Sequence, residues 1–355
     1  MNQEEALALL LRNTEEVVTR EEAVALLARP GPKKAYIGYE PSGLFHIGQG
    51  LITSQKIKDL TALGFEVNVL LADWHAYIND KMDGDMNAIK ACGAYLKDCF
   101  LALGVDPQHV HFLYTSDMVG SADYWQKVLK ISKASSVSRI RRAMTVMGRK
   151  EDEADVDASK LIYPAMQAAD IFHQELDLAL GGMDQRHAHM LARDAADKLG
   201  WKKFVAIHTP LLMSLQGTGR MDVAIADGEG KMSKSKPESC VFLHDSPKEI
   251  QDKLNKAYCP AKESKGNPVL DHCRLIIFPI LGKLEIVRPE KFGGNAAFAT
   301  YEELEKAFAD GNVHPMDLKK AVAAALSDIL APTRAYLEMH PENLEKVKRI
   351  AEGRK

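Results

Sequence analysis

The stretch AYIGYEPSGLFHIGQG, residues 35–50, decides the fold of this chain. Its apolar first part predicts a strand over 35–40, and the turn-forming string PSG then leads into a predicted helix that begins near His46. Gly43 and Gly48 would let the backbone approach a nucleotide with no Cβ in the way. The N-terminus of the helix would offer unpaired N–H groups to phosphate. The stretch therefore predicts a strand-turn-helix unit that binds a nucleotide.

The residues that follow extend this unit into a larger sheet. A nearly continuous apolar run over 65–72 predicts a strand covered on both faces, a helix is predicted over roughly 85–103, and a further strand over 109–113. This βαβαβ succession predicts an α/β fold with a doubly wound parallel sheet of Rossmann type. The ligand site of such a sheet lies at the carboxyl ends of its strands.

Other segments are assigned by the same patterns. Residues 1–30 are predicted to form two short amphipathic helices, and a polar, helical segment over about 118–160 is predicted to be an insertion. The pattern of the sheet half then returns, with helices expected over 164–178 and 184–199 and a strand over 205–208.

We expect three parts in the chain. Residues 1–215 would form the Rossmann-type catalytic domain, and residues 216–245, rich in Gly, Ser and Lys, would form a mobile loop and linker. Residues 246–355, where helical patterns dominate, would form a smaller α-helical domain.

Composition restricts the class of protein. The chain has 355 residues, with hydrophobic residues at 46% and charged residues at 27%, which is typical of a soluble globular protein. Its formal net charge of -3 argues against a generally basic nucleic-acid binder and leaves RNA contact to local basic patches. The acidic start lacks a secretory signal, and no run approaches the ~20 apolar residues of a membrane helix. The 5 cysteines form no C-x-x-C pair. We expect a cytoplasmic protein with reduced thiols, no metal site and no membrane contact.

A second signature lies far from the first. The string Lys231-Met232-Ser233-Lys234-Ser235 follows a glycine-containing turn. Two ammonium groups three residues apart can follow a triphosphate as charge moves onto pyrophosphate, and His46 can donate a hydrogen bond to phosphate oxygens.

Together the two signatures resemble the paired motifs of class I aminoacyl-tRNA synthetases. One departure is Gln49, where that family usually has a second histidine. The resemblance implies ATP as a substrate, with Mg²⁺ arriving on its phosphates and no tightly bound metal or organic cofactor. The implied catalytic residues are His46, Lys231 and Lys234. The implied ATP-binding residues are Gly38, His46, Gly48, Lys231, Met232 and Lys234.

A candidate amino-acid pocket is built from polar and aromatic residues. Tyr163, Gln167 and Asp170 have spacings of four and three, so one helix places them on a single face. Tyr36 and Gln185 complete the candidate set. A carboxylate and a phenol that face a substrate phenol would satisfy both its hydrogen and its lone pair. Such a pocket rejects the analogue that lacks the hydroxyl, because its own polar groups would then stay unpaired.

Longer strings make the resemblance more specific. AYIGYEPSG, LLADWHAY, YPAMQAADI, GGMDQRHAHMLAR, KAYCPA, RPEKFGG and HPMDLK resemble the archaeal and eukaryotic branch of tyrosyl-tRNA synthetases, over roughly residues 5–336. The resemblance implies that Tyr36, Tyr163, Gln167, Asp170 and Gln185 hold tyrosine. It also implies formation of tyrosyl-adenylate and pyrophosphate from tyrosine and ATP, transfer to the 3'-terminal ribose of tRNA(Tyr) with release of AMP, and a homodimer.

Several residues are candidates for contact with tRNA. Arg139 and Arg142 belong to a basic cluster in the insertion that could grip an acceptor stem or be a solvated helix face. The resemblance implies that Arg186 reads the first base pair of the stem, and that Phe292 and Asp317 lie near the anticodon. His314 lies close to both in the sequence and is a candidate for the same contact. Without the resemblance, Phe292 would be a core residue and Asp317 the cap of a helix.

Three alternatives remain at this point. A tryptophanyl-tRNA synthetase would share the architecture, although Asp170 and Tyr36 together favour a phenol over an indole. A small-molecule nucleotidylyltransferase would have no use for the C-terminal helices. A non-catalytic RNA-binding relative would not need both lysines of the second signature. The pairs His109/His111 and His187/His189 have spacings that disfavour joint metal ligation, so we expect structural histidines.

Overall fold

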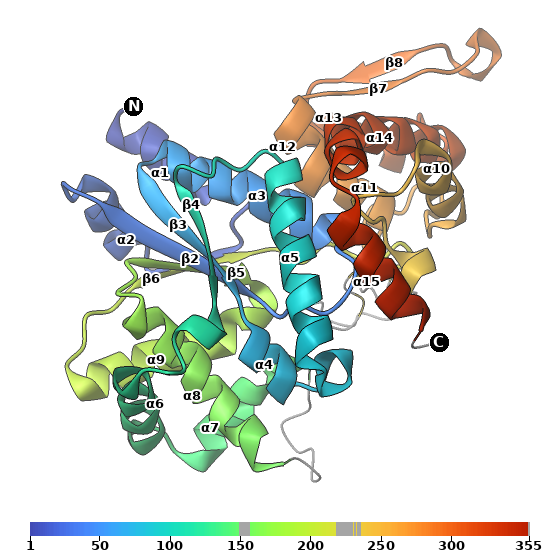
Figure 1. Cartoon of the computed structure of the whole chain (residues 1–355). Helices are drawn as coiled ribbons and strands as arrows, with labels where there is room; N and C mark the ends of the chain where they lie inside the picture. The colour runs from blue at the N-terminus through green and yellow to red at the C-terminus, as the bar shows by residue number, and fades with distance from the viewer. Residues whose placement is uncertain (149–156, 218–229, 231, 233–235, 354–355) are drawn as a thin grey trace.

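The computed structural model describes residues 1–148, 157–217, 230, 232 and 236–353. Its centre is a six-stranded sheet with the strand order β1-β6-β5-β2-β3-β4 (Figure 1). The strands are β1 (Glu16–Val18), β2 (Lys33–Tyr39), β3 (Phe65–Leu71), β4 (Val110–Tyr114), β5 (Leu178–Gly182) and β6 (Val205–Thr209). All neighbouring pairs are parallel except β1 with β6. The predicted doubly wound α/β fold is confirmed.

The order of strands reverses on either side of β2. The chain runs outward from β2 to β3 and β4 on one side, and from β5 to β6 on the other. The register pairs Tyr39 with Leu71 and Gly182 with Thr209, so the carboxyl ends of these strands lie along one edge. Ligands of doubly wound sheets bind where the strand order reverses, which here is the crevice between β2 and β5.

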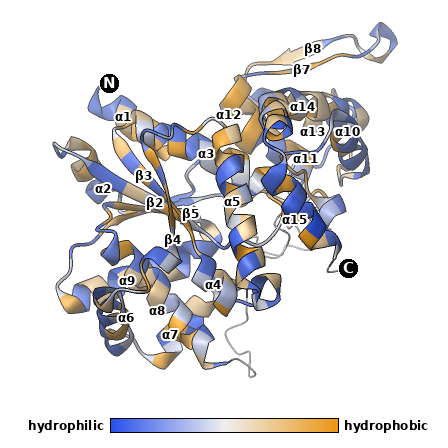
Figure 2. Ribbon diagram, viewed as in Figure 1, coloured by the Kyte–Doolittle hydropathy of each residue, from blue (hydrophilic) through white to orange (hydrophobic). Residues whose placement is uncertain are grey.

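Alternate residues of each strand enter two different cores. Ala35, Ile37 and Val67 belong to a cluster under α3 (Ile47–Ala62) and α5 (Met86–Ala102). Tyr36 and Ala179 point to the opposite face, toward α8 (Ala158–His173) and α9 (Arg186–Leu199). The sheet is therefore covered on both faces, as the apolar runs of its strands predicted, and Figure 2 shows hydrophobic residues gathered on the central strands.

Short elements complete the sheet half. The N-terminal helices α1 (Gln3–Leu11) and α2 (Arg20–Ala28) match the prediction for residues 1–30, although the short strand β1 between them was not predicted. The insertion contains α6 (Ala122–Ala134) and α7 (Val137–Ala143), which pack on α8 and α9. The short helix α4 (Asp73–Ile78) follows β3 directly.

The predicted helix over 164–178 was wrong at both ends. The helix α8 starts at Ala158, because the side chain of Asp157 caps it by accepting a hydrogen bond from the N–H of Ser159, and Pro164 lies inside it. Residues 178–182 form the strand β5, which was not predicted. A Cβ on Gly181 would lie 2.8 Å from Cβ of Gln185, so only glycine fits there.

The C-terminal part is helical with one exception. Its helices are α10 (Pro247–Lys256), α11 (Pro268–His272), α12 (Phe278–Leu281), α13 (Tyr301–Asp310), α14 (Pro315–Met339) and α15 (Glu342–Glu352). The exception is a protruding hairpin of β7 (Leu284–Ile286) and β8 (Ala296–Phe298), visible at the upper right of Figure 1. The helical patterns of the sequence did not predict this hairpin.

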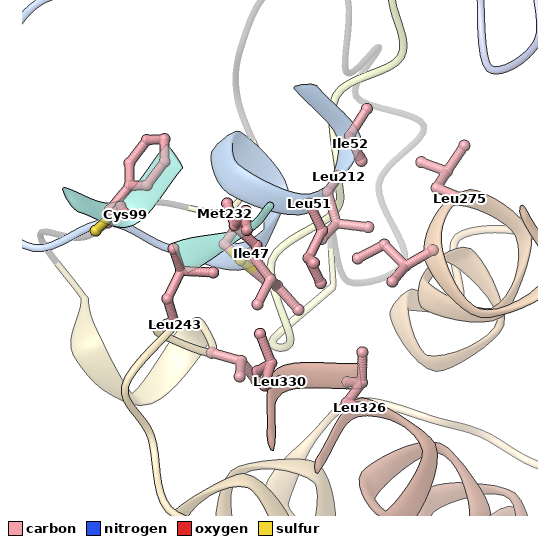
Figure 3. Close-up of a cluster of buried hydrophobic side chains, with 14 of the residues drawn as sticks. Ile47, Leu51, Ile52, Cys99, Leu212, Met232, Leu243, Leu275, Leu326 and Leu330 are labelled. Atoms are coloured by element: carbon pink, nitrogen blue, oxygen red, sulfur yellow. The ribbon is translucent and has the colours of Figure 1, made fainter. Parts of the chain in front are cut away.

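One hydrophobic cluster joins the sheet half to the C-terminal helices. Figure 3 shows Leu326 and Leu330 of α14 facing Ile47 and Leu51 of α3, with Met232 beside Ile47. Polar contacts support the joint: the Asn343 amide donates to Asp98 at 2.8 Å. Across the described residues, no helix is both long and apolar enough to cross a membrane.

Candidate functional site

A cavity of about 360 Å³ opens at the carboxyl ends of β2 and β5. Predicted residues from distant parts of the sequence line it together: Tyr36, Gly38, His46, Gly48, Tyr163, Gln167, Asp170, Gln185 and Met232. The structure thus brings all five predicted tyrosine-pocket residues and the first ATP signature into one site. Lys231 and Lys234 lie outside the described residues.

Asp170 is the most buried charged group of the cavity, with 1% of its surface exposed. Its Oδ1 accepts a hydrogen bond from the Tyr124 hydroxyl at 2.9 Å, and its Oδ2 lies 3.2 Å from Nε2 of His75. Burial raises the pKa of Asp170, while the hydrogen bond from Tyr124 opposes that rise. One carboxylate therefore sits between two fixed partners at the base of the cavity.

Tyr36 faces the same carboxylate from β2. Burial and, after it, the negative charge of Asp170 raise the pKa of the Tyr36 hydroxyl, while a hydrogen bond with Gln167 lowers it. The phenol thus stays protonated near neutral pH. Tyr36 and Asp170 offer a donor and an acceptor to one ligand oxygen.

The other wall of the cavity carries amides and a second carboxylate. Gln167 donates to Oε1 of Gln185 at 3.0 Å, which orients both side chains. The Tyr163 hydroxyl donates to Glu40 at 2.7 Å, and Glu40 also accepts hydrogen bonds from the Asn79 amide at 3.0 and 3.1 Å. These oxygens and the carboxylate suit a cationic ammonium group.

Sequence reasoning missed three residues of this site. Tyr124 lies in the insertion and His75 on α4, and only the folding of α6 and α4 against α8 brings them to Asp170. Glu40 follows the last residue of β2, so its place at a strand's carboxyl end was a usable signal.

The first ATP signature forms the start of α3. His46 is the N-cap residue and is 5% exposed, and its side chain makes no capping hydrogen bond. A Cβ on Gly48 would lie 3.2 Å from Nδ1 of His46, so glycine leaves room for this imidazole beside the cavity. In the first turn of α3, the N–H of Ile47 donates to the carbonyl of Val241 at 2.9 Å, and the N–H of Gln49 donates to the carbonyl of His46 at 3.1 Å.

The second signature is anchored beside this turn. The N–H of Met232 donates to the carbonyl of Leu212 at 2.9 Å, and the N–H of Ser214 donates to the carbonyl of Gly230 at 2.9 Å. The Met232 side chain is 4% exposed and packs in the cluster of Figure 3. Met232, the described residue of the signature, is therefore held at the edge of the cavity.

The predicted tRNA residues fall into two groups far apart in the fold. Arg139 and Arg142 lie on α7, where Arg139 Nε donates to Asp194 at 2.9 Å and Arg142 is exposed. Arg186 begins α9, against which α7 packs. Arg139 and Arg142 belong to the insertion, whereas Arg186 directly follows Gln185, which lines the cavity.

The second group lies at the C-terminal hairpin. Phe292 is 60% exposed in the connection between β7 and β8, so the core assignment was wrong. The cap of α14 is His314, whose Nδ1 accepts from the N–H of Met316 at 3.2 Å, and not Asp317. Arg288 links the hairpin to this helix start through the carbonyl of Asn312 at 2.9 Å, and its NH1 lies 3.9 Å from Asp317.

The remaining histidines make protein contacts. His109 and His111 each lie 2.9 Å from a different oxygen of Glu66, and His187 lies 3.0 Å from the hydroxyl of Thr145. Within the described ranges, no three His, Cys, Asp or Glu side chains are grouped to hold a metal ion.

Buried histidines predict a loss of stability in mild acid. Burial lowers the pKa of five of them below 6.5: His75 to about 3, His244 to about 4, and His189, His208 and His272. Between the lowered and ordinary pKa values the unfolded chain binds more protons, so the free energy of unfolding falls as pH falls from about 6.5 toward 4, by up to ~1.4 kcal/mol per pH unit for each histidine. The raised pKa values of Asp170, Asp245 and His109 act with the opposite sign, but these are three groups against five.

Urea unfolding at pH 7, 6 and 5 measures this effect. Replacing His244 with glutamine should flatten the dependence, whereas the same change at the exposed His340 should leave it unchanged. A free energy of unfolding that does not vary between pH 7 and 5 would contradict the prediction.

The family model for class I tRNA synthetases (W and Y) matches residues 29–331. Because the match spans most of the chain, the protein belongs to this class of synthetases. This class contains enzymes for tryptophan and for tyrosine, and two relatives distinguish between these amino acids. Tyrosine–tRNA ligase from Saccharolobus solfataricus is 48% identical over 359 residues, which cover 99% of this chain and 98% of the relative. Tyrosine–tRNA ligase from Aeropyrum pernix is 51% identical over 337 residues, covering 93% and 92%. The chain therefore belongs to the tyrosine–tRNA ligases.

A solved structure agrees with this assignment. Tyrosyl-tRNA synthetase from Pyrococcus horikoshii, complexed with L-tyrosine, is similar to this chain with a TM-score of 0.92 and 43% identity. The similarity covers 98% of this chain and 100% of that one.

Proposed function

We propose that this enzyme joins L-tyrosine to tRNA(Tyr) in two steps. The tyrosine carboxylate attacks the α-phosphate of ATP, which forms tyrosyl-adenylate and releases pyrophosphate. A terminal ribose hydroxyl of the tRNA then takes the tyrosyl group and releases AMP. Positioning and charge stabilisation dominate such transfers, so no covalent enzyme intermediate is needed.

The buried carboxylate of Asp170 is the observation that carries this proposal. A tyrosine side chain in the cavity would donate its phenolic hydrogen to Asp170 and accept a hydrogen bond from Tyr36. An indole has an N–H but no lone pair to accept the hydroxyl hydrogen of Tyr36, which would then lack an acceptor. The ammonium group would lie near Tyr163, Gln167 and Gln185, at the more polar wall.

Pyrophosphate exchange with each amino acid offered separately tests the proposal. We expect exchange with tyrosine and far slower exchange with tryptophan and phenylalanine at the same concentration. Exchange that requires tryptophan, or that no amino acid supports, would overturn it.

The ATP site is proposed at the start of α3. His46 would donate to phosphate oxygens, while Gly38 and Gly48 leave room for the nucleotide. Lys231 and Lys234 would neutralise the charge that develops on pyrophosphate, and Met232 would anchor their loop through its contact with Leu212. Mg²⁺ would arrive with the phosphates of ATP, which need few protein ligands.

Contact with tRNA is proposed at two places. Arg139, Arg142 and Arg186 would hold the acceptor end near the cavity, because phosphate attracts clustered cations. Phe292, His314 and Asp317 would meet the anticodon at the hairpin, where an exposed ring can stack on a base. We propose the corresponding division into domains. Residues 1–215 form the catalytic domain, residues 216–245 link it to the C-terminal domain, and residues 246–355 form the domain that binds the anticodon.

Replacing Phe292 with alanine is expected to raise the KM for tRNA roughly tenfold, since stacking on one base contributes ~1–3 kcal/mol. Tyrosine-dependent pyrophosphate exchange should stay unchanged because the hairpin lies outside the cavity. Aminoacylation kinetics measure the effect, with Met339→Ala, an equally accessible apolar residue, as the control. An unchanged KM for tRNA would exclude Phe292 from the interface.

A homodimer in the cytoplasm, where tRNA and ATP are available, completes the proposal. The insertion and α8 expose large apolar side chains: Trp125 39%, Leu129 67%, Val137 66% and Ile162 41%. Trp125 and Leu129 are one turn apart on α6, and contiguous exposed apolar residues mark protein–protein contacts. Leu129→Glu should convert the dimer to a monomer in light scattering, while Met339→Glu should not. A wild-type protein that is monomeric at micromolar concentration would contradict this.

A further inference from the structure

Four side chains form a continuous row of polar contacts that runs from the surface into the protein, behind the tyrosine cavity. Nε of Arg186 lies 2.9 Å from both carboxylate oxygens of Glu16. Oε2 of Glu16 lies 2.8 Å from Nδ1 of His208, and Nε2 of His208 lies 3.0 Å from Nδ1 of His189. Glu16 is on β1, His208 on β6, and Arg186 and His189 on α9, so three elements are tied together.

The two inner side chains of this row, His208 and His189, are buried and held in place. His208 and His189 are 0% and 1% exposed, and their rings stack at 5.1 Å. The register of the sheet sets Glu16 opposite His208, so the backbone itself aligns the two side chains. The hydrogen bond between His208 and His189 and the pairing of β1 with β6 fix the position of the His208 ring.

The outer half presents a cation. The side chain of Arg186 is 40% exposed and that of Glu16 is 27% exposed. Among the described residues, Arg186 donates only through Nε, so its two terminal nitrogens remain available to a ligand. Gln185, the preceding residue, lines the tyrosine cavity.

An ordinary surface ion pair would not account for this arrangement. Exposed pairs contribute only ~0–1 kcal/mol, because both long side chains move freely. Here Oε2 of the carboxylate also lies 2.8 Å from the buried imidazole of His208, and the arginine is oriented through Nε rather than through its two terminal nitrogens. The arrangement fixes where these nitrogens point.

We propose that Glu16, supported by His208, is a positioning residue for the transfer step: it holds Arg186 in the orientation that binds the acceptor end of tRNA. This inference rests on the proposed contact of Arg186 with tRNA. It assigns Glu16 no part in tyrosine activation, because neither Glu16 nor His208 lines the cavity.

Glu16→Gln tests the proposal, since it removes the charge and keeps the size of the side chain. We expect the KM for tRNA to rise roughly tenfold, as for loss of a charge-assisted hydrogen bond, while kcat and tyrosine-dependent exchange stay within about twofold. The matched control is Glu15→Gln, which makes the same charge change at the exposed neighbouring residue and should alter neither reaction.

A double-mutant cycle separates positioning from general support of the fold. If Glu16 acts through Arg186, then Glu16→Gln should add little to the KM increase of Arg186→Gln. Additive effects, a parallel fall of exchange and aminoacylation, or an unchanged KM in Glu16→Gln would each overturn the proposal. If Glu16→Gln does not fold, Arg186→Lys replaces it, because this variant keeps the charge and loses the Nε contact. It should likewise raise the KM for tRNA and leave tyrosine-dependent exchange unchanged.

Wild-type exchange is measured first. If the unmodified enzyme fails to exchange pyrophosphate with tyrosine, the proposed function is wrong, independently of Glu16.

Discussion

Asp170→Asn is expected to lower kcat/KM for tyrosine activation roughly a hundredfold to a thousandfold. The kcat/KM for phenylalanine activation should stay nearly unchanged. The substitution keeps the shape of the side chain but replaces a carboxylate acceptor with a neutral amide. Loss of a buried, charged hydrogen bond of this kind costs about 3–4 kcal/mol in the transition state. Tyrosyl-tRNA synthetases are themselves the usual illustration of discrimination by a hydroxyl-binding pocket.

The measurement is pyrophosphate exchange with tyrosine and with phenylalanine. Tyr124→Phe is a milder variant for comparison. It removes one hydrogen-bond donor to Asp170 and leaves the packing of α6 on α8 in place. We expect it to shift selectivity in the same direction by a smaller factor. A tyrosine-to-phenylalanine ratio that survives Asp170→Asn would show that the phenol binds elsewhere.

His46→Ala should lower kcat for tyrosyl-adenylate formation by about a hundredfold, with the KM for tyrosine within about twofold. Removing one preorganised donor to a charge that develops in the transition state has an effect of roughly this size. The tyrosine pocket should be unaffected, because the phenol-binding pair Tyr36 and Asp170 lies on β2 and α8 rather than at the start of α3.

Single-turnover formation of tyrosyl-adenylate gives this rate without product release. His46→Asn is the informative partner variant, since asparagine is a good N-cap residue and keeps a donor. It should retain more activity than His46→Ala with equal stability to urea. A variant that raises the KM for tyrosine and keeps kcat would assign His46 to substrate binding instead.

The first strand-turn-helix unit and the polar face of α8 could be predicted from the sequence because each depends on local pattern. Apolar runs locate β2 and β3, and the spacing of Tyr163, Gln167 and Asp170 predicts one helix face whatever the rest of the chain does. Resemblance, rather than spacing, connected that face to Tyr36 and Gln185.

The residues that sequence reasoning missed depend on tertiary contact. Nothing near Tyr124 or His75 indicates that both meet Asp170, since α6 and α4 pack on α8 from different directions. Strand β5 was missed because it ends in two glycines, which are unfavourable in a strand, whereas Gly181 is required by the close approach of Gln185. Phe292 is exposed because the hairpin carries it away from the helices, and a short hairpin has no periodic signal.

The hydrophobic cluster of Figure 3 has a consequence for rebuilding this protein. Leu326 and Leu330 complete a core that begins at α3. The C-terminal helices therefore cannot be exchanged for those of another protein without changing α3 as well. Cutting the chain ahead of α14 would leave Ile47 and Leu51 facing water and invite self-association. A chimaera that takes its anticodon reader from another synthetase must therefore import both sides of this contact, including the leucines of α14 and their partners on α3.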